Sequence, residues 1–188
     1  MPIHRKTIRL NRSNYVGLRR YFVTMCCARR AQIFVNPAIV ARAIEILNGS
    51  SAQFGFAVRA YCFMPDHAHV LAEGLEATSS LLDFIHDFKQ RTAFEFGRDA
   101  TGPLWQFKYY DYILRNRDSQ ESVAWYIWMN PVRKGLVNDP WDYPFSGSFT
   151  FNWKDRLRPP EAWSPSWKKQ KQELPSSKCG VTQAKSKD

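Results

Sequence analysis

The sequence predicts an α+β fold in which an antiparallel β-sheet packs against α-helices. Three observations lead to this prediction. Strand-like and helix-like segments alternate along the chain, a very short turn joins two of the strands, and 44% of the 188 residues are hydrophobic. Charged residues make up 23%, as in an ordinary globular protein, so disorder throughout the chain is excluded. A chain of this length suits one domain with tails.

Four segments have the β-branched and aromatic residues that are typical of strands. They are residues 21–27, 56–63, 67–72 and 109–114. Only Met64, Pro65 and Asp66 separate the second segment from the third. Because so short a connection can join only antiparallel neighbours, we expect these two strands to form a hairpin.

Three segments have apolar residues at the spacing of an amphipathic helix. They are residues 37–47, 79–96 and 118–130. The Asn36–Pro37 pair is a suitable cap and first turn for the first helix. Asp118 and Glu121 resemble a capping box at the start of the third helix. We expect that helix to end at Asn130, because Pro131 disfavours helical dihedral angles in the residue before it.

The order strand, helix, strand, strand, helix, strand is that of the ferredoxin-like split βαβ arrangement. We therefore expect an antiparallel sheet with the helices on one face. Residues 20–150 are expected to form this domain, and residues 1–19 to form a basic N-terminal arm. From Pro165 onward the chain carries six lysines among Ser, Gln and Pro. This composition favours a basic, disordered tail over residues 151–188.

Several protein classes are disfavoured by the sequence. No apolar run approaches the roughly 20 residues of a membrane span, and no apolar stretch follows the basic N-terminus as in a secretory signal. The four cysteines form no Cys-x-x-Cys pair, which argues against a disulfide framework or a cysteine-based zinc site. We therefore expect a soluble cytoplasmic protein.

Positive charge is concentrated near the N-terminus. The chain has 27 Lys and Arg against 17 Asp and Glu, a net charge of +10, and no acidic residue precedes Glu45. A polyanion such as nucleic acid would relieve the repulsion between these cations, and a content of 15% aromatic residues suits stacking on single strands. The alternative is a solubilising surface.

The candidate phosphate-binding residues come from three places. Those in and after the arm are Arg5, Lys6, Arg9, Arg12, Arg19 and Arg20. Lys89 and Arg91 lie on the second predicted helix, and Arg115 follows the fourth strand. For Lys89 and Arg91, a solvated helix face is an equally good interpretation.

The sharpest local motif is His67-Ala68-His69, directly after the predicted turn. In a strand, residues i and i+2 point to the same face, so both imidazoles could reach one metal ion. Val70 and Leu71 indicate that the pair stands at the start of a buried strand. The alternative is two surface histidines, because this short motif is frequent by chance.

The third predicted helix carries Tyr126 and Asn130, which are four residues apart and therefore neighbours on one helix face. A phenol is a possible nucleophile, and an amide oxygen is a usable metal ligand. Tyr126 could instead be a core aromatic residue, and Asn130 a polar residue at a helix end.

Three blocks in order carry a resemblance to a known family. They are Cys62 to Leu71, then Leu104 to Asp111, and then Tyr126 to Val137. They resemble the successive blocks of the tyrosine transposases of the HUH type, above all the branch associated with repetitive extragenic palindromes. The segment from Trp141 to Ser146 is similar to a tryptophan and serine segment of that branch. Together the similar regions run from about Tyr21 to Ser148.

The resemblance implies a ferredoxin-like nuclease that cuts and joins single-stranded DNA at hairpins through a 5′-phosphotyrosine intermediate. It implies that His67, His69 and Asn130 hold Mg²⁺ or Mn²⁺ and that Tyr126 is the nucleophile. The partner is then single-stranded, hairpin-forming DNA, bound by a monomer or a homodimer. Two positions depart from the family pattern, Ala68 between the histidines and Tyr112 after the Tyr-Asp pair.

Three other interpretations stay open. Within the same fold, the chain could be a domesticated nuclease that processes repeats without moving itself. It could be a single-stranded DNA-binding protein without catalysis. It could also be a hydrolase that activates water on a metal held by His67 and His69. Tyr109, Tyr110 and Tyr112 are rival nucleophiles, although their strand supplies no metal-binding neighbour.

Overall fold

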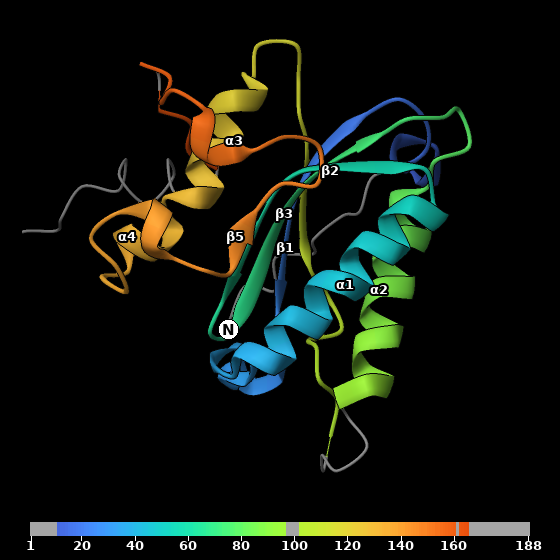
Figure 1. The fold of residues 1–188 in the computed structure, drawn as a ribbon. Coiled ribbons are helices and arrows are strands. Elements are labelled where there is room, and N and C mark those ends of the chain that lie inside the picture. Colours follow the sequence, from blue (N-terminus) through green and yellow to red (C-terminus); the bar gives the residue numbers. More distant parts are fainter. Residues whose placement is uncertain (1–10, 97–101, 161, 166–188) are drawn as a thin grey trace, which may run out of the picture.

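A single five-stranded sheet organises the computed structural model, which describes residues 11–96, 102–160 and 162–165. The strands are β1 (Arg20–Cys26), β2 (Phe56–Met64), β3 (His67–Gly74), β4 (Tyr110–Ile113) and β5 (Ser146–Gly147). Their order in the sheet is β4-β1-β3-β2-β5, and every neighbouring pair is antiparallel. The first four strands and their order confirm the predicted α+β fold and the β2–β3 hairpin. The short β5, which extends the sheet beside β2, was not predicted (Figure 1).

The helices lie on both faces of the sheet, so the expectation that they share one face is wrong. The helices are α1 (Pro37–Gln53), α2 (Leu81–Phe96), α3 (Gln120–Trp128) and α4 (Asn130–Arg133). Helices α1 and α2 cover one face, and α3 crosses the opposite face (Figure 1). The physical reason lies in α3 itself. All its residues from Ser122 to Trp128 are buried, so it needs apolar partners on most of its circumference.

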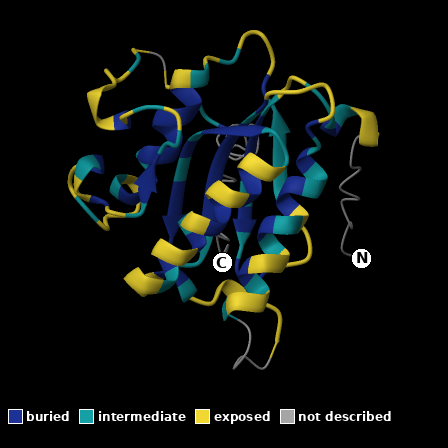
Figure 2. Ribbon diagram, turned by 45° about the vertical axis from the view of Figure 1, so that its right-hand side comes forward, coloured by how far each residue is buried: buried dark blue, intermediate teal, exposed yellow. Residues whose placement is uncertain are grey.

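Strand alternation separates two hydrophobic cores. On β1, Tyr21, Val23 and Met25 join the core under α1 and α2, whereas Phe22 joins the core under α3. Figure 2 shows the buried strands between the layers, and the exposed outer surfaces of the helices. The same alternation places Thr24 on the α3 face of the sheet, like Phe22.

The helix ends differ from prediction in two places. Asn36 caps α1 as expected, since its Oδ1 accepts a hydrogen bond of 2.9 Å from the Ala38 N–H. At α3 the cap is Ser119, not Asp118, and the Ser119 Oγ accepts from the Ser122 N–H. The chain also does not leave the helical path at Asn130. Helix α3 ends at Trp128, and after Met129 the chain continues as α4. Pro131 lies in the first turn of α4, where no N–H is required.

No helix among the described residues is long and apolar enough to cross a membrane. The three cysteines that the structure describes, Cys26, Cys27 and Cys62, are free thiols. Cys179 lies outside the described residues.

Candidate active site

Two imidazoles converge at the start of β3. The Nε2 atoms of His67 and His69 lie 3.1 Å apart, and both side chains point to the α3 face of the sheet because they are two residues apart. Each Nδ1 atom is held by another group. The Asp66 carboxylate lies 2.5 Å from Nδ1 of His67, and the Thr24 hydroxyl lies 2.8 Å from Nδ1 of His69. Metal-binding histidines are commonly oriented in this way through their second ring nitrogen.

Burial and charge keep His67 suitable for metal binding. Burial lowers the pKa of His67 below its usual value, although the Asp66 carboxylate acts in the opposite direction. Burial raises the pKa of Asp66, but His67 and Arg30 outweigh this effect and lower it. The His67 imidazole is therefore neutral near pH 7, which is the form that coordinates metal ions.

Tyr126 projects from α3 towards the histidine pair. Its ring centroid lies 6.4 Å from that of His69 and 5.8 Å from that of Phe22. The side chain is buried, and burial raises the pKa of its phenol, while the charge and hydrogen bonding of Arg133 act to lower it. The hydroxyl is therefore protonated near neutral pH and needs activation before it can act as a nucleophile.

Asn130 is buried one turn after Tyr126, as the spacing predicts. Its Nδ2 donates hydrogen bonds of 3.0 and 3.1 Å to the carbonyl oxygens of Tyr126 and Ile127. These bonds hold the amide nitrogen against the end of α3, so the amide oxygen is the atom that could serve as a ligand. Within the described ranges, no three His, Cys, Asp or Glu side chains are arranged to hold a metal ion. An oxygen from another residue type, such as the Asn130 amide, would complete a three-ligand set.

Arg133 was missed by the sequence interpretation. Its guanidinium lies 4.2 Å from the centroid of the Tyr126 ring, and its Nη2 donates a hydrogen bond of 2.6 Å to the Tyr126 carbonyl oxygen. A planar cation can stack on an aromatic face in this way. The signal in the sequence is the spacing of seven residues, which is two helical turns and returns to the same face.

Trp163 also contacts the candidate nucleophile. Its ring centroid lies 5.1 Å from that of Tyr126, 5.1 Å from that of Phe22 and 6.0 Å from that of Tyr112. This residue stands in the region that the sequence predicts to be a tail. Trp153, in the same region, is buried and packs 4.9 Å from Trp128. The signal in the sequence that this segment packs on the domain is the presence of two tryptophans, Trp153 and Trp163, among its basic residues and prolines.

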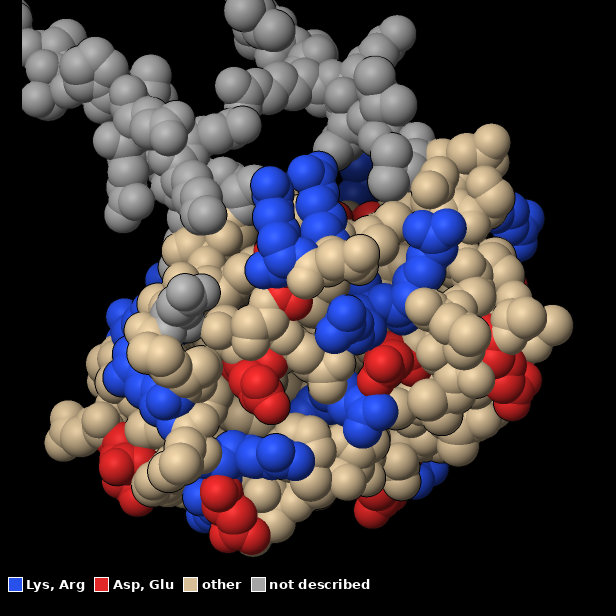
Figure 3. Space-filling view, turned by 90° about the horizontal axis from the view of Figure 1, so that it is seen from above, with Lys and Arg blue, Asp and Glu red and all other residues tan. Residues whose placement is uncertain are grey.

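The candidate phosphate-binding residues that the structure describes are spread over several elements of the fold. Arg5, Lys6 and Arg9 lie outside the described residues. Arg12 pairs with Asp83 at 3.5 Å, and Arg20 donates to the Gln120 side chain at 3.4 Å. Arg19 and Arg115 are exposed. On the surface in Figure 3, Lys and Arg side chains gather near the centre with carboxylates between and around them.

The two candidates on α2 have structural partners. Lys89 donates hydrogen bonds of 2.8 and 3.1 Å to the carbonyl oxygens of Gln106 and Phe107. Arg91 lies 3.6 Å from the Asp87 carboxylate and also hydrogen-bonds the Ser50 hydroxyl. Lys89 therefore fastens the segment before β4 to α2, and Arg91 joins α2 to α1.

Comparison with known proteins agrees with this fold. The family model of the IS200-like transposases matches residues 16–130, which is more than half of the chain. A REP-associated tyrosine transposase of Escherichia coli (strain K12) is 25% identical over 91 residues, which cover 48% of this chain and 53% of the relative. The chain thus spans about half the length of the curated relative that it matches.

A solved structure shares the fold. It is a REP-associated tyrosine transposase bound to a REP hairpin, with a TM-score of 0.62 and 22% identity, and the match covers 74% of this chain and 82% of that one. The family match over residues 16–130 contains the histidine pair, Tyr126 and Asn130. This chain belongs to the family of IS200-like transposases.

Proposed function

We propose that this protein is a metal-dependent transposase that cuts and rejoins single-stranded DNA at hairpins through a 5′-phosphotyrosine intermediate. One observation carries the proposal: the Tyr126 ring lies 6.4 Å from His69, whose Nε2 converges with that of His67. A nucleophile beside a metal-binding pair favours phosphoryl transfer over DNA binding alone. The relative that is bound to a REP hairpin supports a hairpin-forming palindromic repeat as the substrate.

The donor set fits a divalent cation. Two imidazoles and an amide oxygen, from His67, His69 and Asn130, would hold Mn²⁺, or Mg²⁺ with several waters retained. Bound there, such an ion would neutralise charge on the scissile phosphate and orient it for attack. Asp66 and Thr24 keep the imidazoles in position through their Nδ1 atoms.

The protein's own residues would then carry the transfer. The Tyr126 oxygen forms a bond to phosphorus, the bond from phosphorus to the 3′ oxygen of the neighbouring nucleotide breaks, and the phenol proton passes to solvent. The leaving 3′ oxygen takes up a proton. A second 3′ hydroxyl can attack the phosphotyrosine, which joins two strands and regenerates the phenol. Arg133, on the Tyr126 ring, would hold the nucleophile and favour its anionic form.

A denaturing gel tests the proposal. A labelled hairpin strand is incubated with the protein and Mn²⁺ or Mg²⁺, with chelator as the control. We expect a labelled band that is heavier by the mass of the protein and that requires the metal. Cleavage without such a band would favour the water-using hydrolase, and binding without cleavage would favour a DNA-binding protein.

Replacing Arg133 by methionine is expected to slow formation of the covalent product by about tenfold, the size of one stacked and hydrogen-bonded cation. Methionine keeps the length and apolar bulk of the side chain but removes its charge and its N–H donors. Arg133→Lys keeps the charge without the planar stack and should recover only part of the rate. Single-turnover kinetics on the gel measures both variants. Equal rates for wild type and Arg133→Met would remove Arg133 from the mechanism.

Replacing Trp163 by alanine is expected to accelerate formation of the covalent product several-fold. The indole packs on Tyr126, whose side chain is only 7% exposed, so a DNA strand must displace Trp163 to reach the phenol. Leu157→Ala is the control, because Leu157 lies in the same region and is 91% exposed. The two variants are compared in the same single-turnover assay. A Trp163→Ala rate at or below that of the control would show that the indole is no obstacle.

A further inference from the structure

A strained turn, Ala28–Arg30, follows β1. Arg29 and Arg30 have φ angles of 53° and 58°, so two consecutive residues with side chains adopt the left-handed conformation. This conformation is unfavourable for residues other than glycine, because the Cβ atom approaches the following carbonyl oxygen. In the described parts of the chain, no other residue except glycine has a positive φ. Strain of this kind persists only where the surrounding structure imposes it, and it is most frequent at functional sites.

Backbone hydrogen bonds hold this turn against the tip of the β2–β3 hairpin. The Cys27 N–H donates to the carbonyl oxygen of Asp66 at 2.9 Å. Beyond the turn, the Phe34 N–H donates to the carbonyl oxygen of Pro65 at 3.0 Å. The tip of the hairpin leads directly into His67. The strained turn is therefore fixed beside the first histidine of the candidate metal site.

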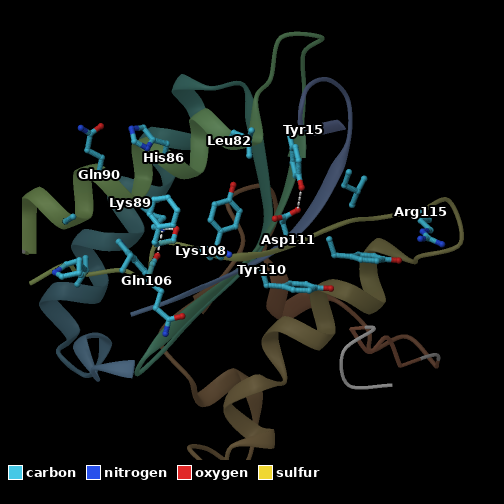
Figure 4. Close-up of a pocket in the computed structure, with 18 residues that line it drawn as sticks. Tyr15, Leu82, His86, Lys89, Gln90, Gln106, Lys108, Tyr110, Asp111 and Arg115 are labelled. Carbon is cyan, nitrogen blue, oxygen red and sulfur yellow. Dashed lines mark hydrogen bonds between the residues drawn. The ribbon is translucent and has the colours of Figure 1, made fainter. Parts of the chain in front are cut away.

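A second segment supports the turn from the side of α2. The Ala28 N–H donates to the carbonyl oxygen of Leu104 at 2.9 Å. The Gln106 N–H donates to the carbonyl oxygen of Cys26 at 2.8 Å. Leu104 and Gln106 lie on one wall of a large groove, and a face of α2 forms the other wall (Figure 4). Lys89 of α2 donates to the Gln106 carbonyl oxygen at 2.8 Å, so this support is itself fastened to a helix.

Arg30 contacts the carboxylate that holds His67. The Arg30 Nη1 donates to Oδ2 of Asp66 at 3.2 Å. The other carboxylate oxygen, Oδ1, lies 2.5 Å from Nδ1 of His67. Both oxygens of the carboxylate thus have a partner, and charge-assisted hydrogen bonds of this kind fix its plane. Without the guanidinium, Oδ2 would lose its charged partner, and the carboxylate could turn about the Cβ–Cγ bond of Asp66.

Folding stability alone does not account for this arrangement. The Arg30 side chain is 56% exposed and that of Asp66 is 28% exposed. An ion pair in such contact with water adds little to the free energy of folding. Two consecutive left-handed residues act against folding. The benefit of the turn is therefore better explained by the orientation of the Asp66 carboxylate than by stability.

We infer that Arg30 is a positioning residue, which holds the His67 ring through the Asp66 carboxylate so that its Nε2 converges with that of His69. The inference rests on the proposed function, because it concerns how one of the proposed metal ligands is oriented. All three proposed ligands remain in the protein when Arg30 is replaced. Its replacement therefore changes the order of the His67 ring and not the set of donor atoms.

Arg30→Gly and Arg29→Gly form a matched pair of variants. Both remove one positive charge and relieve one left-handed residue, but only Arg30→Gly removes the contact with Asp66. Arg29 is exposed and forms no ion pair with another residue of the described chain. Both variants are expected to fold, because glycine adopts the left-handed conformation without strain. Thermal unfolding checks this.

Calorimetric titration of the metal-free protein with Mn²⁺ is the first measurement. Arg30→Gly is expected to lower the Mn²⁺ affinity about tenfold, at the lower end of what is lost with a group that orients a metal ligand. Arg29→Gly should bind Mn²⁺ like wild type. Arg30→Lys keeps the charge without the planar guanidinium and should recover only part of the affinity.

Carbon-13 relaxation of the His67 ring in the metal-free protein is the second measurement, and it requires neither metal nor DNA. The ring is expected to be less ordered in Arg30→Gly than in wild type. In Arg29→Gly it should be as ordered as in wild type, because the Asp66 carboxylate keeps both partners.

Three results would overturn the inference. One is wild-type Mn²⁺ affinity and wild-type ring order in a folded Arg30→Gly protein. Another is an equal loss in both glycine variants, which would mean that the charge of the turn matters and the contact with Asp66 does not. The third is slower formation of the covalent product by Arg30→Gly with unchanged Mn²⁺ affinity and ring order, which would assign Arg30 to contact with DNA.

The two proposals can fail separately. If the His67 ring loses order in Arg30→Gly but wild-type protein forms no covalent product with metal, the positioning role stands and the transferase proposal fails. If wild-type protein forms the product and Arg30→Gly matches Arg29→Gly in ring order and Mn²⁺ affinity, the positioning role alone fails.

Discussion

Replacing Tyr126 by phenylalanine is expected to abolish the covalent protein–DNA product, with a rate loss of at least about a thousandfold, as when other enzymes lose a nucleophile. Hairpin binding should remain, because phenylalanine keeps the ring that contacts Phe22, Trp163 and Arg133. Only the phenol oxygen is removed. The gel assay for the product and an equilibrium binding measurement check the two halves of this prediction.

Tyr112→Phe is the matched control for this experiment. Tyr112 lies on β4, contacts the same Trp163, and donates its hydroxyl to Asp118 at 2.9 Å. Its loss should leave product formation near the wild-type rate. Product formation that survives Tyr126→Phe but not Tyr112→Phe would assign the nucleophile to β4 and overturn the proposed mechanism.

Replacing His69 by alanine is expected to remove measurable Mn²⁺ binding and, with it, the metal-dependent product. His69 supplies one of the two converging Nε2 atoms, and no other His, Cys, Asp or Glu of the described residues completes a cluster there. Thr24→Val, which removes the hydroxyl on Nδ1 of His69, should weaken Mn²⁺ binding by about 10–100-fold. Calorimetric titration with Mn²⁺ measures both.

His86→Ala is the control for metal binding, since His86 is exposed on α2 and lines the groove instead of the candidate metal site. Its Mn²⁺ affinity should equal that of wild type. Because His69 is buried, thermal unfolding must show that the His69→Ala protein is folded. A folded His69→Ala protein with unchanged Mn²⁺ affinity would place the metal elsewhere.

Much of the fold could be predicted because local patterns determine it. The alternation of strand and helix signals, with the short turn from Met64 to Asp66, leaves few ways to pair four strands. The face covered by α3 could not be inferred from element order alone. Its unbroken burial from Ser122 to Trp128 depends on a second core, which residues distant in sequence such as Phe22 and Leu71 supply.

Part of the candidate site could likewise be predicted from local spacing, and part depends on tertiary structure. The histidine pair and the pair of Tyr126 with Asn130 follow from spacing within one strand and one helix face. Thr24 could not be found in this way, because it reaches His69 only through the pairing of β1 with β3. Trp163 is brought to Tyr126 by tertiary packing alone.

Charge in the sequence did not reveal the role of individual cations. Lys89 and Arg91 stand on one helix, yet Lys89 bonds two carbonyl oxygens, and Arg91 pairs with Asp87. Composition reports an excess of positive charge, whereas the partner of each side chain is set by the fold.

The central claim, that Tyr126 becomes covalently attached to DNA, is tested most directly by mass spectrometry of the trapped product. Trypsin cleaves after Arg117 and Arg133, and the resulting peptide contains Tyr126 as its only tyrosine. The rival tyrosines fall in a separate peptide of residues 109–115. After nuclease digestion, a nucleotide phosphate on Tyr126 in the peptide of residues 118–133 is the predicted result. Attachment to the peptide of residues 109–115, or free 5′ phosphates with no modified peptide, would contradict the account.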